Sequence, residues 1–210
     1  TNGTLRTATI FDYETNASTY SIRLRASDEY NASVEGNFTV KIKDWFNSPW
    51  AKIRAEDATE LAMFGGAVSI HKNLLSVGAP YSDPDGIANA GSVYLYHVGE
   101  NVSTTFLTKV TAPDKMTADR FGTTLSQGKD FLAVGSPNSS PNGVEKAGSV
   151  YLYRTESNGT TMFKSKLTAP EISESAKFGS TIVQFGEILA VGTPFADPEG
   201  ILDAGVVYLY

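Results

Sequence analysis

The chain has 210 residues, no cysteine, a net charge of −6 and a pI of about 4.9. The lack of cysteine excludes a disulfide framework, a thiol nucleophile and thiolate metal sites, and the acidic balance argues against nucleic-acid binding, which needs clustered Lys and Arg. No apolar run approaches the ~18 residues of a membrane span, so no membrane-spanning segment is predicted.

Residues 1–48 differ from the rest of the chain and predict β-strands. Apolar and polar residues alternate in Ser21–Ala26, which indicates a half-buried strand. Together with the Asp-x-Glu turn in Phe11–Thr15 and the run Phe38–Asp44, this segment resembles the C-terminal part of a cadherin repeat. The resemblance implies a fragment of a β-sandwich whose earlier strands precede this sequence.

The cadherin-like resemblance also implies a calcium site. Its oxygen ligands would be Asp12, Glu14 and Asp44, which are hard donors of the kind that calcium prefers. The stretch Asp44–Pro49 departs from the family pattern, because it lacks the Asn-Asp-Asn core and is one residue shorter. The alternative is that Asp12 accepts hydrogen bonds within a turn and that Glu14 is solvated.

From residue 49 onward the chain repeats itself with a period of 57 residues. Four markers keep this spacing: Lys-x-(Arg/Thr)-Ala at 52, 109 and 166, Phe-Gly at 64, 121 and 178, Gly-(Ala/Ser/Thr)-Pro at 78, 135 and 192, and AGSVYLY or AGVVYLY at 90, 147 and 204. Four markers with one spacing indicate a repeat architecture.

Each repeat contains short runs rich in β-branched and aromatic residues, bounded by Gly, Pro, Asn and Asp, which predict strands. In chain order we name them D, A, B and C. Strand D is predicted at 52–55, 106–111 and 162–168, strand A from each Phe-Gly pair, strand B at 74–77, 131–134 and 188–191, and strand C at 92–96, 149–153 and 206–210. No run shows helical periodicity of sufficient length, so the predicted fold class is all-β.

Strand C predicts how these sheets pack, because both of its alternating faces are bulky. A sheet buried on both faces lies between neighbours, and four-stranded sheets stacked at a fixed period are the blades of a β-propeller. Residues 49–210 are therefore expected to form a partial propeller of three four-stranded blades. The third is expected to lack its D strand and to leave an open edge, as in a segment of a longer protein, while the first D strand is a candidate to close the ring.

Three residue types are expected to shape the contacts between blades. Phe64, Phe121 and Phe178 should fill the space between neighbouring blades. Gly65 and Gly78 should allow their backbones to approach closely. The Pro that follows each Gly-x should end strand B, because it cannot donate to a ladder.

The Phe-Gly pairs, the Gly-Ala-Pro motif and the AGSVYLY motif resemble the FG-GAP repeat over about residues 50–210. This resemblance implies a propeller like the head of integrin α subunits, in an extracellular or cell-surface protein. Many such repeats carry an Asp-x-Asp-x-Asp-Gly calcium loop between strands A and B, which these repeats lack, so no cofactor is expected in the propeller. Turn chemistry explains the acidic stretches 83–86 and 197–200, with calcium binding as the alternative.

The sequence predicts a non-catalytic binding or adhesion module with a protein or glycan ligand, because it carries no catalytic constellation or phosphate loop. In the integrin-like arrangement the D–A and B–C loops share one rim, and loops on a rigid scaffold usually carry binding. The residues expected to contact a ligand are Asp83, Asp85, Asp114, Lys115, Asp119, Arg120, Glu171, Glu174, Asp197 and Asp203. The alternatives are an accessory propeller domain of a large secreted hydrolase and a structural spacer in a surface protein.

Asn-X-Ser/Thr triplets are frequent and allow two interpretations. In a secreted eukaryotic protein they would accept glycans on exposed loops or strand ends, but a Ser/Thr-rich β protein also forms such triplets by chance. The seven triplets begin at residues 2, 16, 31, 37, 101, 138 and 158.

Overall fold

The computed structural model describes residues 19–27, 29–30, 32–41 and 50–210. The chain divides into two units, residues 1–50 and 51–210. All regular elements of the described residues are strands, apart from four short 3-10 turns at Pro84–Gly86, Glu100–Val102, Pro141–Gly143 and Pro198–Gly200. The all-β prediction is therefore confirmed.

The described part of the first unit is a two-stranded antiparallel sheet. Strand β1 (Thr19–Ser27) pairs with β2 (Ser33–Lys41), with Thr19 opposite Lys41. The Arg23 guanidinium forms an ion pair with the Glu35 carboxylate across the two strands. Strands were predicted in this region, whereas the proposed calcium ligands Asp12, Glu14 and Asp44 lie outside the described residues.

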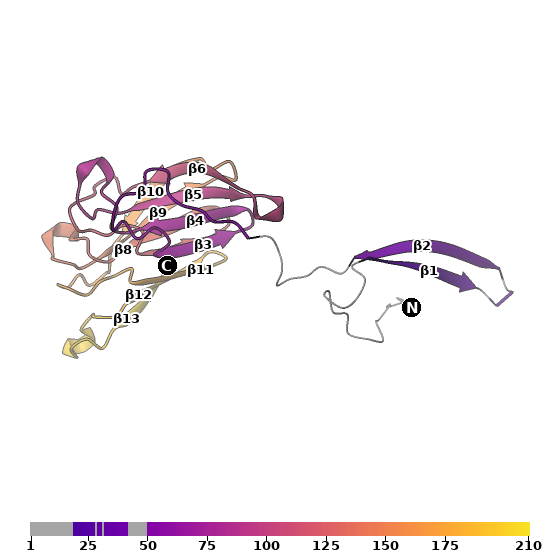
Figure 1. The fold of residues 1–210 in the computed structure, drawn as a ribbon. Helices are drawn as coiled ribbons and strands as arrows, with labels where there is room; N and C mark the ends of the chain where they lie inside the picture. The colour runs from indigo at the N-terminus through magenta and orange to yellow at the C-terminus, as the bar shows by residue number, and fades with distance from the viewer. Residues whose placement is uncertain (1–18, 28, 31, 42–49) are drawn as a thin grey trace. The chain divides into compact units, whose positions relative to one another are not determined.

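The second unit contains three antiparallel sheets in chain order (Figure 1). Sheet I consists of β3 (Ala67–His71), β4 (Leu74–Ala79), β5 (Ser92–Val98) and β6 (Thr104–Val110). Sheet II consists of β7 (Thr124–Gln127), β8 (Phe131–Ser136), β9 (Ser149–Thr155) and β10 (Thr161–Leu167). Sheet III consists of β11 (Thr181–Phe185), β12 (Ile188–Thr193) and β13 (Val206–Leu209). Equivalent strands start 57 residues apart, which confirms the period.

Two strand predictions need correction. The run at 52–55 forms no strand; Ala55 and Ile53 instead pack against Tyr94 and Tyr96 on the face of sheet I, where their backbone has no strand to pair with. The A strands begin three residues after each Phe, because the intervening Gly of the Phe-Gly pair has a positive φ that does not fit a strand. Sheet III has three strands, in agreement with the expectation that the third unit lacks its D strand.

Neighbouring sheets share apolar cores, and β7 lies next to both β3 and β11. Between sheets I and II, Val93 and Leu95 pack with Phe121 and Tyr151, all fully buried. A second core between sheets II and III contains Val150 and Phe178. Phe121 and Phe178 thus fill the space between sheets as predicted, whereas Phe64 is only half-buried because no sheet packs on its far side.

Glycines set the distance between the sheets. A Cβ on Gly78 would lie 2.1 Å from the carbonyl oxygen of Gly122, so only glycine fits there, as predicted. The same prediction for Gly65 was wrong, because a Cβ there would have no heavy atom within 4 Å. Its φ of +91° explains the glycine instead. Strands β4, β8 and β12 each end at the residue before a proline, as expected.

Candidate functional site

The loops between strands form one continuous rim in the second unit. We name the B–C loops 80–91, 137–148 and 194–205, and the D–A loops 111–123 and 168–180. The amides of Ala118 and Phe121 donate to the carbonyls of Ala88 and Ala90, each at 2.9 Å. The next pair of loops repeats the arrangement, since Phe178 N donates to Ala147 O at 2.8 Å. Each D–A loop is therefore held against the B–C loop of the preceding sheet.

Several acidic rim residues close their own loops. The Asp83 carboxylate accepts a hydrogen bond from Asn89 N at 2.7 Å, and Asp197 accepts one from Asp203 N at 2.7 Å. In the middle repeat the Ser140 hydroxyl accepts from Lys146 N at 3.2 Å. A neutral serine serves at the equivalent position, so loop closure accounts for Asp83 and Asp197 without a metal.

One ion pair of the rim joins two loops that the sequence singled out. Lys115 Nζ lies 2.9 Å from a carboxylate oxygen of Asp85, which connects a D–A loop to the preceding B–C loop. Nearby in the sequence, the Arg120 guanidinium lies 4.6 Å from the centre of the Tyr81 ring, a cation–π contact between the same two loops. The buried Arg120 Nε has no hydrogen-bond partner among the described residues.

Asp119 differs from the exposed rim residues because it is buried. Its carboxylate accepts a hydrogen bond from Met116 N at 2.8 Å, and its carbonyl accepts one from the Ser136 hydroxyl at 2.8 Å. Burial raises the pKa of this carboxyl above its ordinary value. Asp119 therefore organises its loop from within rather than facing a ligand.

Asp114 belongs to a structural contact that the sequence reasoning missed. Its carboxylate accepts hydrogen bonds from the Tyr151 hydroxyl at 2.8 Å and from Lys166 Nζ at 2.7 Å. One repeat earlier, Asp57 accepts from Tyr94 at 2.8 Å and from Lys109 at 2.6 Å. We name each of these three-residue groups a latch, because it ties the segment entering a sheet to that sheet's C and D strands. The 57-residue spacing of Asp57, Asp114 and Glu171 was the signal that could have revealed it.

The latch shifts the pKa values of its members. Burial alone would raise the pKa of the Asp114 carboxyl, but the hydrogen bonds from Lys166 and Tyr151 outweigh it and hold this pKa below its ordinary value. Burial, with the Asp114 carboxylate beside it, raises the pKa of Tyr151 far above that of a free tyrosine. In the third repeat, burial and the charge of Glu171 raise the pKa of Tyr208.

The acidic residues that the sequence singled out in the third repeat are accessible to solvent. Glu171, Glu174, Asp197 and Asp203 are all exposed. The structure thus joins Asp85 with Lys115 and Asp197 with Asp203, uses Asp114 and Asp119 to hold loops, and leaves Glu171 and Glu174 free to face solvent.

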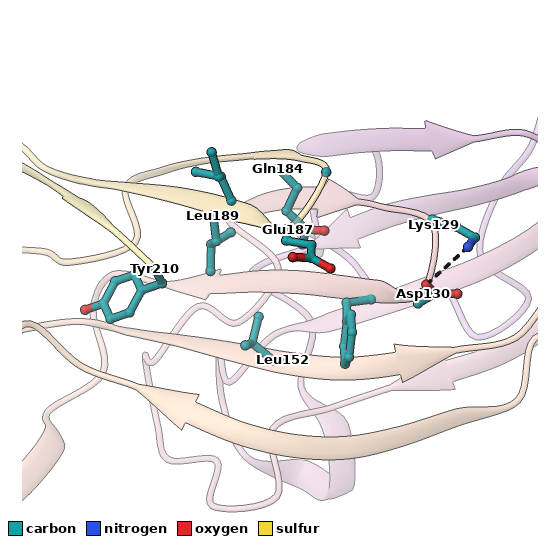
Figure 2. Close-up of a pocket in the computed structure, with 10 residues that line it drawn as sticks. Lys129, Asp130, Leu152, Gln184, Glu187, Leu189 and Tyr210 are labelled. Carbon is teal, nitrogen blue, oxygen red and sulfur yellow. Dashed lines mark ion pairs between the residues drawn. The ribbon is translucent and has the colours of Figure 1, made fainter.

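A cavity of about 520 Å³ lies away from the rim, beside the turns that connect strands A and B in sheets II and III (Figure 2). Leu152, Leu189 and Tyr210 contribute apolar surface, and Gln184 and Glu187 contribute polar groups. The sequence reasoning assigned no binding role to these residues. Among the described residues, no group of three or more His, Asp or Glu side chains could hold a metal ion.

Comparison with known proteins identifies the repeat. Residues 48–96 and 104–153 each match the FG-GAP repeat. No curated protein matches the chain, and the cadherin-like resemblance of residues 1–48 stays a prediction. No helix in the described ranges is both long and apolar enough to cross a membrane.

Proposed function

We propose that the two FG-GAP repeats and the third, similar unit are blades of a β-propeller that serves as a non-catalytic binding module of an extracellular or cell-surface protein. FG-GAP repeats are typical of extracellular, adhesion-type modules. The ligand is a protein or a glycan, and it contacts the rim of D–A and B–C loops.

The observation that carries this proposal is the continuity of the rim. Main-chain hydrogen bonds connect each D–A loop to the preceding B–C loop, so loops from successive repeats present one surface. The loops are anchored on sheets with fully buried cores, which limits the entropy that a ligand would have to remove. Rigid loops of this kind are where binding residues concentrate.

The charges of the rim favour recognition through polar contacts. Asp85 is three-quarters exposed even though it pairs with Lys115, so its second oxygen is available to a ligand. Glu171 and Glu174 add exposed carboxylates on the next D–A loop. These side chains suit a ligand that offers ammonium, guanidinium or hydroxyl donors.

We further propose that Asp12, Glu14 and Asp44 bind calcium, because carboxylate oxygens are the hard donors that calcium prefers. The propeller itself is proposed to need no cofactor. To test the calcium site, ligand binding is measured once in calcium and once in EDTA. The difference in binding between these two conditions is expected to be lost in Asp12→Asn.

The experiment uses fluorescently labelled full chain on a glycan array and on intact cells before and after protease or glycosidase treatment. We expect binding that Asp85→Lys and Glu174→Lys weaken at least tenfold, about 1.4 kcal/mol. Lys129→Glu, an exposed change beside the cavity and away from the rim, is the matched control and should bind normally. No binding on either surface, or equal loss in the control, contradicts the proposal and favours a structural spacer or an accessory domain.

A further inference from the structure

The middle B–C loop has an asparagine where the other two B–C loops have an acidic residue. Asn142-Gly143 is equivalent to Asp85-Gly86 and Glu199-Gly200. All three pairs lie in the same kind of turn, and the residue before the glycine has a φ of 55° in the first two loops and 56° in the third. This position on the rim is therefore acidic in two repeats and neutral in one, although the backbone has the same conformation.

An Asn-Gly pair can lose its side-chain amide in a reaction that needs only water. The backbone nitrogen of Gly143 attacks the side-chain carbonyl carbon of Asn142 and gives up its proton, and the side-chain nitrogen leaves as ammonia. Water then adds to one of the two carbonyl carbons of the resulting cyclic imide and opens the ring, which restores the N–H. The product is aspartate, or isoaspartate when the main chain comes to run through Cβ. Glycine favours ring closure because it has no Cβ that hinders the attacking nitrogen.

The structure leaves the Asn142 side chain free to react. It is exposed, and within the described ranges it makes no hydrogen bond. Gly143 is also exposed, and a Cβ there would meet no heavy atom within 4 Å. The peptide between the two residues has to rotate before the nitrogen can reach the side-chain carbon. Gly143 N donates to Ser140 O at 3.2 Å, the long limit for such a bond, so this rotation breaks one weak hydrogen bond.

The same dipeptide in the loop between β9 and β10, Asn158-Gly159, is held in place. The Asn158 side-chain oxygen accepts a hydrogen bond from Thr160 N at 2.9 Å. Gly159 N donates to Glu156 O at 2.9 Å. Gly159 is buried, and a Cβ there would lie 2.5 Å from the Leu107 Cβ. Rotation of this peptide would break both hydrogen bonds and disturb the contact with Leu107, so this pair lacks the freedom of the pair on the rim.

We propose that Asn142 is a modification site, at which spontaneous deamidation adds a negative charge to the rim, and that Asn158 resists the same reaction. Aspartate fits at position 142, because Asp85 adopts the same φ in the first repeat. Lys115, the partner of Asp85, is replaced by Ile172 in the next repeat, so the new carboxylate lacks the equivalent ion pair. It is therefore available to a cationic group of a ligand. This last step rests on the function proposed above, but the deamidation does not.

Peptide mapping of the full chain, after prolonged incubation at neutral pH and physiological temperature, tests the proposal. Trypsin places the two pairs on separate peptides, 130–146 and 155–164, and fragment masses locate the modified residue. We expect Asn142 to convert at least about tenfold faster than Asn158, because two hydrogen bonds have to break before Asn158 can react. A third pair, Asn2-Gly3, lies outside the described residues.

Two comparisons show whether the fold and the ring closure control the reaction. In urea, where both pairs are released from the fold, the two rates should become similar. In the folded chain, Gly143→Ala should slow conversion at Asn142 and leave Asn158 unchanged, because the added Cβ obstructs the attacking nitrogen. Circular dichroism confirms that this variant is folded.

Three results would overturn the proposal: equal rates at Asn142 and Asn158 in the folded chain, an unchanged rate in Gly143→Ala, or no conversion at Asn142 over a period in which both pairs convert in urea. All of these masses are measured without a ligand. The absence of binding at the rim would therefore contradict the proposed function and leave the modification site standing.

Discussion

At the scale of single residues, the latches show how an acidic chain uses its carboxylates structurally. Asp57 and Asp114 are each half exposed, yet each accepts one hydrogen bond from a tyrosine and one from a lysine. Because the lysine also lies over the tyrosine ring, at 5.2 Å for Lys109 and 5.1 Å for Lys166, three side chains hold one another in place. A partly exposed pair of this kind contributes about 0.5–1 kcal/mol.

The latches predict a dependence of stability on pH. The folded pKa of both carboxyls lies below the ordinary value of 3.8, so their stabilisation is complete above that pH and is lost as the pH falls through the lower folded value. The double variant Asp57→Asn, Asp114→Asn should lose about 1–2 kcal/mol at pH 7, and in urea unfolding its stability should converge with that of the wild type as the pH falls through the lowered folded pKa. Glu174→Gln, on the same rim, is the control; a constant difference at every pH would show that charge plays no part.

At the scale of strands, the local sequence pattern predicted strands B and C closely. It predicted strand D only in the repeats where a preceding C strand can pair with it. Runs such as Ser92–Tyr96 form strands wherever adjacent strands pair with them. The run at 52–55 has the same kind of sequence but lies on a sheet face, and sequence alone does not show which backbone will find a partner.

The interlocking glycines predict a specific cost of adding a single methyl group. Gly78 has an ordinary backbone conformation, so Gly78→Ala should destabilise the chain only through the contact with Gly122, by about 1–3 kcal/mol or more. Gly86 has a φ of +77° and no neighbour within 4 Å, so Gly86→Ala should lose only about 1 kcal/mol, from backbone strain. Urea unfolding at one pH compares the two, and equal losses would argue against close packing of sheets I and II.

The candidate site was less predictable than the strands for a related reason. That neighbouring loops share a rim followed from the repeat, but which acidic residues stay free did not. Asp114 and Tyr151 are 37 residues apart, and the buried Asp119 accepts a hydrogen bond from Ser136, which is 17 residues away, so neither role has a local signature. The proposed ligands of the first unit lie outside the described residues and stay predictions.

At the scale of the whole molecule, the second unit behaves as a linear array in which each sheet depends on its neighbours. Val150 and Val207 are the same side chain at the same repeat position, but one is fully buried and the other is two-thirds exposed. In thermal unfolding at low protein concentration, Val150→Ala should lower stability by about 2 kcal/mol and Val207→Ala by less than about 0.5 kcal/mol. A similar loss for both would mean that the side of sheet III that carries Val207 is already covered within one chain.

The glycine pairs between sheets have a consequence for how such a protein can change length over evolution. A tandem duplication of one 57-residue repeat would also copy the glycines that let each sheet lie close to the next. The added sheet could therefore pack against its neighbours without changes to the existing side chains. Whole repeats can therefore be added or removed without repacking, whereas the loss of a glycine that lies against the next sheet, such as Gly78, would disrupt a contact that every longer descendant inherits.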